Sequence, residues 1–163
     1  MKVVKFEEIF DLFVSNLRSK SLIPVIGSGF TAGCNCFKGT VPSTQKYKQD
    51  MEDELYKKLC LTEEEFKQLK SESFSSVAAL YIKEIDDDVK RNYFLSYFTK
   101  VCINEHKRNF LKIDWSYIYT LNIDDCIETN CDYQRVIRSN EKVYNDIFNQ
   151  YKCLIKLHGD VTE

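Results

Sequence analysis

Three apolar runs in this 163-residue chain each end abruptly in a small polar cluster, and this pattern limits the possible folds more than any other feature. The runs cover residues 22–26, 115–121 and 153–157, and their apolar and branched side chains predict buried strands. Pro24 weakens the prediction at the start of the first run, because proline has no amide hydrogen to donate to a sheet. If the strands are parallel neighbours, the three clusters meet at the sheet edge where open α/β sheets bind ligands. We therefore expect an α/β fold with a Rossmann-like parallel sheet.

The rest of the chain is predicted to be mostly helical. Apolar residues recur at helical spacing over residues 6–19, and residues 43–103 contain several further stripes, including those of residues 74–85 and 94–101 that we expect in the core. Thr62 and Glu65 have the spacing of a capping box. A weaker strand is expected at residues 135–137. Residues 1–163 are thus predicted to be one domain with a helical insertion at about residues 43–109. Such domains normally continue with further strands, so we expect an incomplete, N-terminal part of one.

Composition narrows the functional class. The net charge of −2 lacks the basic excess of a dedicated nucleic-acid binder. No apolar stretch approaches the length of about 20 residues that spans a bilayer, and the acidic start of the chain does not resemble a signal peptide. The seven cysteines form no disulfide-like framework and no C-x-x-C pair, which favours a reduced, cytoplasmic protein without a four-cysteine zinc site.

The first polar cluster is glycine-rich. The segment Gly27-Ser28-Gly29-Phe30-Thr31-Ala32 fits the G-x-G-x-x-G/A pattern, in which glycines let the backbone approach a pyrophosphate. The alternative is an ordinary glycine-rich turn. The acidic residues about 20 positions later lie in a polar helical stretch instead of at a second strand end, so the dehydrogenase version of this motif is poorly supported.

The second and third clusters contain polar side chains that suit catalysis. Asn122 supplies an amide that both donates and accepts, and Asp124 supplies a carboxylate, although both residue types also cap helices. His158 follows an apolar run, and a histidine is the usual base near neutral pH. The alternative for His158 is a structural histidine at a strand end. The other histidine, His106, lies in a hydrophilic run and is expected to be exposed.

Taken together, the clusters resemble the sirtuin family, which has a G-A-G-x-S turn, a T-Q-N-I-D segment and a catalytic His-Gly pair in this order. The matching segments are Gly27-Ser28-Gly29-Phe30-Thr31, Thr120-Leu121-Asn122-Ile123-Asp124 and His158-Gly159. These variants, with Val41-Pro42-Ser43, are most similar to bacterial sirtuin-like domains of anti-phage defence proteins.

The resemblance implies an NAD hydrolase that releases nicotinamide and ADP-ribose, as the effector domain of a defence protein with a sensor domain or homo-oligomer partner. Asn122 would orient the attacking water or the ribose, and His158 would act as general base or polarise a ribose hydroxyl. A carboxylate and oriented dipoles can stabilise the oxocarbenium character that develops as the bond breaks. The residues implied in binding NAD are Gly27, Ser28, Gly29, Phe30, Thr31, Thr120, Asp124 and Gly159.

The chain departs from the family in two respects. Leu121 stands where the family has glutamine, which changes a side chain that lines the pocket. The zinc-binding cysteines of the deacylase members have no counterpart, which disfavours an NAD-dependent protein deacylase. A non-catalytic nucleotide-binding or oligomerisation module is the other alternative.

Overall fold

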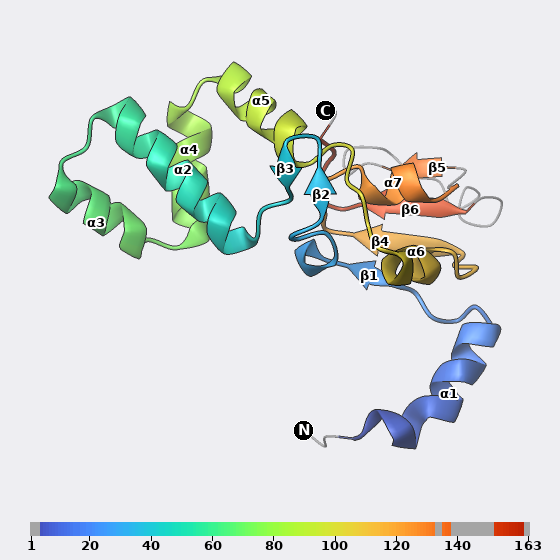
Figure 1. The fold of residues 1–163 in the computed structure, drawn as a ribbon. Coiled ribbons are helices and arrows are strands. Elements are labelled where there is room, and N and C mark those ends of the chain that lie inside the picture. Colours follow the sequence, from blue (N-terminus) through green and yellow to red (C-terminus); the bar gives the residue numbers. More distant parts are fainter. Residues whose placement is uncertain (1–3, 133–134, 138–151, 162–163) are drawn as a thin grey trace.

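The computed structural model describes residues 4–132, 135–137 and 152–161, which form a mixed α/β architecture (Figure 1). In chain order the elements are α1 (Phe6–Arg18), β1 (Val25–Ile26), the 3₁₀ turn η1 (Ser28–Phe30), β2 (Asn35–Cys36), β3 (Gly39–Thr40), α2 (Thr44–Leu59), α3 (Glu63–Ser71), α4 (Phe74–Glu84), α5 (Asp87–Tyr97), α6 (Glu105–Leu111), β4 (Tyr117–Thr120), α7 (Cys126–Asn130), β5 (Arg135–Ile137) and β6 (Cys153–Lys156).

Four strands form a parallel sheet in the order β1-β4-β6-β5, which confirms the predicted α/β class and corresponds to a partial Rossmann-like fold. Ile26 of β1 lies opposite Thr120 of β4, and Thr120 lies opposite Lys156 of β6. The carboxyl ends of these three strands are therefore aligned. Strands β2 and β3 form a separate antiparallel ribbon.

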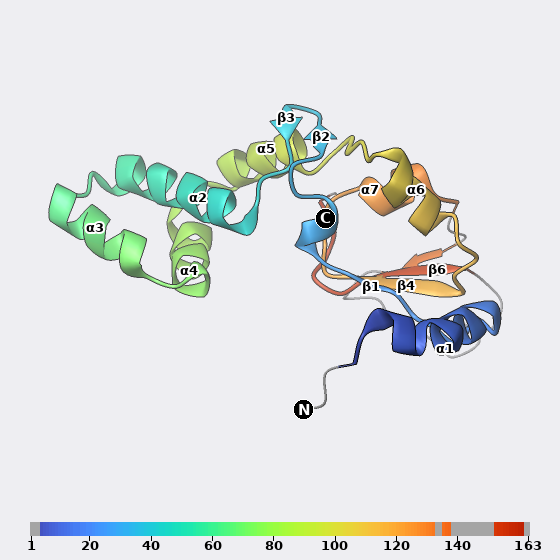
Figure 2. The ribbon, with the colours of Figure 1, turned by 60° about the horizontal axis from the view of Figure 1, so that its bottom comes forward.

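One face of the sheet carries the main core. Helices α6 and α7 lie over this face, whereas α1 lies on the other side of the sheet (Figure 2). The core residues are Ile26, Val41, Val101, Ile103, Leu111, Trp115, Ile118, Cys126, Ile127 and Leu154. Alternation along each strand puts Ile118 and Leu154 in this core, while Tyr117, Cys153 and Ile155 pack on the opposite face.

The first strand is shorter and more exposed than predicted. The carbonyl of Pro24 accepts a hydrogen bond from the Tyr119 amide, but Pro24 has no amide hydrogen to return. Ile26 is 4% exposed and Val25 is 67% exposed. The prediction of a buried strand is therefore wrong for the face of β1 that carries Val25.

Helices α2–α5 form a helical lobe (residues 44–97) beside the sheet (Figure 1). The side chains of Ser43, Thr62 and Ser73 cap α2, α3 and α4, and the capping box of Thr62 and Glu65 is present as predicted. The lobe has its own core of Met51, Leu55, Leu69, Val77, Tyr81 and Ile85. Ile82, which was predicted to be in the core, is 65% exposed, because α4 packs against α2 through its Val77–Tyr81 face.

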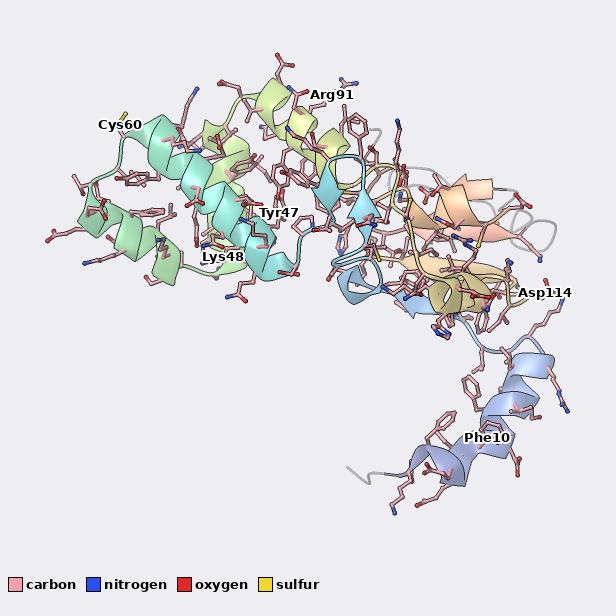
Figure 3. The ribbon with its side chains drawn as sticks, viewed as in Figure 1. Phe10, Tyr47, Lys48, Cys60, Arg91 and Asp114 are labelled. Carbon is pink, nitrogen blue, oxygen red and sulfur yellow. The ribbon has the colours of Figure 1, made fainter. Side chains whose placement is uncertain are left out.

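Helix α1 leaves most of its apolar side chains exposed, although Leu17 packs against the main core. The predicted helix is confirmed, but it contains no buried residue. Phe6 makes edge contacts with Phe10 and Phe13, and all three rings remain exposed. Figure 3 shows Phe10 on a helix that lies apart from the helical lobe. Among the described residues, no helix combines the length and apolar character needed to cross a bilayer.

The separate core of the helical lobe yields a stability prediction. Leu55→Ala removes a fully buried side chain, so we expect a loss of about 2–5 kcal/mol in the free energy of unfolding. Ile82→Ala on the exposed face of α4 should change it by less than about 0.5 kcal/mol. Urea denaturation of both variants measures the difference, and equal losses would contradict the assignment of the core.

Candidate functional site

The three polar clusters meet at one edge of the sheet. Gly27, Leu121 and Leu157 are the first residues beyond β1, β4 and β6, whose last paired residues are aligned in register. The Leu121 amide donates to the Ile26 carbonyl, and the Leu157 amide donates to the Thr120 carbonyl at 2.9 Å each. The sheet therefore brings the glycine segment next to residues more than 90 positions further along the chain.

Side-chain hydrogen bonds join the first two clusters. The Thr31 hydroxyl donates to Asp124 Oδ2 at 2.8 Å, and Asn122 Nδ2 donates to the same hydroxyl at 3.0 Å. Thr31, Asn122 and Asp124 are 1%, 7% and 4% exposed. Thr120, another residue of the second cluster, links β4 to β1 because its hydroxyl donates to the Ile26 carbonyl. Thr31 and Thr120 thus have protein partners and act as interior links of the site.

This network sets the orientation of the Asn122 amide. A threonine hydroxyl has one proton, and an ionised carboxylate can only accept, so the Thr31 proton goes to Asp124. The Thr31 oxygen must then accept from the Asn122 NH₂ group, which turns Asn122 Oδ1 away from Thr31. No described residue donates a hydrogen bond to this oxygen. Asn122 Oδ1 is therefore available to accept from a water molecule or a ligand hydroxyl.

Asp124 holds the loop that follows β4. Its Oδ1 accepts from the Cys126 amide at 3.1 Å, two residues further on, which is the pattern of an Asx turn. The N-cap of α7 is Asp125, which makes no side-chain capping bond. Burial raises the pKa of Asp124, and the hydrogen bonds from Thr31 and the Cys126 amide oppose this shift. The neighbouring Asp125 accepts from the amides of Lys100 and Val101, which ties the same loop to the segment that follows α5.

The glycine segment forms a 3₁₀ turn instead of an open loop. The Phe30 amide donates to the Gly27 carbonyl, and the amides of Thr31 and Ala32 donate to the Ser28 carbonyl. Gly27 and Gly29 have no positive φ, and a Cβ atom at either position would meet no atom within 4 Å. Neither backbone conformation nor packing in the described structure requires glycine here. The space beside the turn is open to an approaching ligand.

Pockets lie on both sides of this turn. One, of about 330 Å³, is lined by Ser28, Thr31, Val41, Pro42, Thr44, Tyr47, Phe74, Phe98, Leu121, Asn122, Ile123 and Asp124. Its volume lies within the usual range of small-molecule sites, about 300–1000 Å³. The second, of about 630 Å³, is lined by Val25, Ile26, Gly27, Ser28, Gly29, Phe30, Lys107 and Phe110. Ser28 lines both pockets.

The helical lobe supplies an aromatic wall of the smaller pocket. Tyr47 lies near the end of α2 that adjoins the ribbon of β2 and β3 (Figure 3). Its ring centroid is 6.0 Å from those of both Phe74 and Phe98. Burial raises the pKa of Tyr47, so its phenol stays neutral at physiological pH. Leu121, at the position of the expected family glutamine, lines the pocket and is 43% exposed.

His158 lies at the third strand end, at the rim of the site. It is exposed, and it is not one of the residues that line the pocket with Ser28 and Asn122. The next residue, Gly159, has φ +91°, a conformation that favours glycine. The Val161 amide donates to the Ile123 carbonyl and holds this segment against the loop of Asn122. A side-chain hydrogen bond from Asn122 to Thr31 thus joins the glycine turn to Asn122. Backbone hydrogen bonds of Leu157 and Val161 hold the segment of His158 against the same loop. His106 is exposed on α6, as expected.

No family model and no curated protein matches this chain. Among the described residues, no group of three or more His, Cys, Asp or Glu side chains is placed to hold a metal ion. The chemistry of the site is therefore inferred from its own geometry.

Sequence reasoning did not identify the aromatic wall or Lys156. Tyr47, Phe74 and Phe98 carry no sequence signal that separates a pocket wall from an ordinary core. Lys156 does carry one, because it is a single charge within the apolar run of residues 153–157. Its side chain is fully buried and contacts the loop of Asn122 and Asp124.

The raised pKa of Asp124 predicts a pH-dependent effect on stability. The folded state binds this proton more tightly than the unfolded chain, whose aspartate pKa is about 3.9. The resulting stabilisation is fully present below the pKa that Asp124 has in the unfolded chain. It is lost as the pH rises through the pKa that Asp124 has in the folded protein. As the pH rises above about 4, the free energy of unfolding should therefore fall more steeply for the parent than for Asp124→Asn.

Urea denaturation at a series of pH values measures this difference. Burial also raises the pKa of Glu128, but that residue is present in both proteins and its contribution cancels in the comparison. Identical pH profiles for the two proteins would show that Asp124 ionises normally in the folded state.

Proposed function

We propose that this chain is the nucleotide-binding part of a sirtuin-like NAD hydrolase, which cleaves the bond between nicotinamide and ribose. The observation that carries the proposal is the parallel register of β1, β4 and β6, which aligns the glycine turn, Asn122 and His158 on adjacent strand ends. In open α/β sheets this edge is the usual place for a nucleotide.

The two pockets support a division of the substrate across the glycine turn. The smaller pocket combines an aromatic wall with the polar groups of Asn122 and Asp124, which suits the nicotinamide and its ribose. The open space beside Gly27 and Gly29 suits the phosphates. Lys107 lines the pocket on the far side of the turn, where its ammonium group would favour an anion.

Asn122 is the residue best placed to act on the reacting carbon. Loss of nicotinamide leaves positive charge on the ribose, and a water molecule must then add to its C1′ carbon. The free Asn122 Oδ1 can accept a hydrogen bond from that water and orient it. Asp124 acts indirectly, because both of its carboxylate oxygens are bonded to Thr31 and the Cys126 amide.

His158 would take part from the rim of the site. Its exposure lets the imidazole exchange protons with solvent, which a general base must do in each turnover. The bond between the Leu157 amide and the Thr120 carbonyl keeps it beside the loop of Asn122. In this proposal His158 removes a proton from the water or from a ribose hydroxyl.

The cellular role, also by resemblance, is that of an effector domain in anti-phage defence, activated through a sensor domain or a second copy.

Nucleotide binding without turnover is the second candidate function. One observation favours it: His158 does not line the pocket that contains Ser28 and Asn122. Calorimetry with NAD distinguishes the two functions, because binding without release of nicotinamide would support the second.

Substitution of the two proposed catalytic residues tests the hydrolase directly. We expect the full-length protein to release nicotinamide from NAD, and Asn122→Ala or His158→Ala to lower the rate by about 10²-fold or more. Asn109→Ala and His106→Ala replace exposed residues on α6 and serve as matched controls with the parent rate. Chromatographic measurement of nicotinamide gives the rates. Parent-like rates in both catalytic variants would contradict the assigned roles.

A pair of glycine substitutions separates binding from stability. Gly29→Ala adds a methyl group to open space at an ordinary φ, so the melting temperature should stay the same or rise slightly. NAD affinity should nevertheless fall by about tenfold, or about 1.4 kcal/mol, because the methyl group enters the phosphate space. Gly39→Ala should instead lower the melting temperature and leave the NAD affinity unchanged. Gly39 has φ +107° and lies outside both pockets of the turn. Unchanged NAD affinity in Gly29→Ala would remove the turn from the binding site.

A further inference from the structure

Lys156 is a charged residue in a place that normally holds an apolar one. It is the last residue of β6, between β4 and β5 in the sheet, and it is 0% exposed. Burying an ammonium group is costly unless opposite charges and hydrogen-bond acceptors surround it. The environment of Lys156 therefore shows which parts of the chain the residue connects.

Four oxygens from three segments surround the Lys156 ammonium. Its Nζ lies 2.8 Å from the Asp124 carbonyl oxygen and 3.3 Å from that of Ile123, both in the loop after β4. It lies 2.6 Å from Glu128 Oε1 on α7 and 2.9 Å from Asp160 Oδ2 in the loop after β6. The three N–H groups of the ammonium are thus matched by three close acceptors and one more distant one.

These contacts connect the two loops that carry Asn122 and His158. On one side, Lys156 holds the Asp124 carbonyl, and the Asp124 side chain continues through Thr31 to the Asn122 amide. On the other side, the ion pair with Asp160 closes a five-residue segment around His158 and Gly159. The side chain of Lys156 is the point at which both chains of contacts meet.

We propose that Lys156 is a positioning residue, which holds the Asn122 loop and the His158 loop at the separation required for catalysis. The expected effect on catalysis rests on the proposed hydrolase function. The connection between the two loops, however, can be measured without any substrate. Lys156 has no contact with the substrate in this proposal and acts through the two residues that it places.

Hydrogen exchange of the ligand-free, full-length protein tests the connection. The amides of Asn122, Cys126, Leu157 and Val161 each donate a hydrogen bond at the two loops, so their exchange rates report on loop opening. In Lys156→Met we expect these amides to exchange about tenfold faster or more, while those of the helical lobe stay protected by its separate core. Lys152→Met is the matched control, because Lys152 is an exposed lysine just before the same strand.

A second variant covers the case in which Lys156→Met does not fold. Asp160→Asn removes one negative partner and leaves Lys156 its other acceptors, so it should accelerate exchange in the same amides, but less. Parent-like exchange at both loops in Asp160→Asn, and in Lys156→Met if it folds, would overturn the proposal.

Kinetics and binding then separate positioning from a general loss of structure. For Lys156→Met or Asp160→Asn, we expect kcat for NAD to fall by up to about 10²-fold while calorimetric titration with ADP-ribose keeps its full stoichiometry. A stoichiometry that falls in step with kcat would mean that molecules unfold, and it would overturn the positioning role. If the parent itself releases no nicotinamide, the proposed function fails, and the exchange experiment alone decides whether Lys156 connects the loops.

Discussion

Parallel pairing of β4 with β1 on one side and β6 on the other is the constraint on which this structure depends. It aligns three strand ends, and every polar contact of the candidate site starts from a residue at or just beyond those ends. Backbone hydrogen bonds continue the alignment beyond the strands, where Leu121 and Leu157 donate to Ile26 and Thr120. The hydroxyls of Thr31 and Thr120 then link neighbouring segments, by bonds to Asp124 and to the Ile26 carbonyl.

Buried charge plays an unusual part in holding the site together. Lys156 contacts the backbone of Asp124 and the side chain of Glu128 at the edge of the main core, and its ammonium group balances the carboxylates around it. Such an arrangement is a poor source of stability compared with apolar packing, but it specifies geometry, because each polar atom demands a partner in a defined direction. Around a site whose chemistry depends on the placement of an amide and an imidazole, this directionality is the property that matters.

Local sequence patterns predicted the element types well and the surroundings of those elements less well. Runs of apolar and branched residues located the strands of the parallel sheet but not β2 and β3, and the Thr62 capping box located the start of α3. These signals depend on neighbours in sequence. Periodicity alone could not show that Ile82 faces solvent, since it marks an apolar face without naming what covers it. The convergence of the three clusters was predictable from the rule for parallel sheets. The tertiary contacts of Tyr47 and Lys156 were not, because their partners lie in other elements, up to about 50 residues away for Tyr47.

The smaller pocket has walls that belong to two independent cores. Thr31, Asn122 and Asp124 are anchored at the edge of the sheet, whereas Tyr47 packs on the apolar interior of the helical lobe and Phe74 contacts the Tyr47 ring. Each interior is built from a different part of the chain, and contacts such as that between the rings of Tyr47 and Phe98 join the two. A molecule bound there would touch both sides and add its binding free energy to their cohesion. Filling the pocket would thus couple the unfolding of the helical lobe more tightly to that of the sheet.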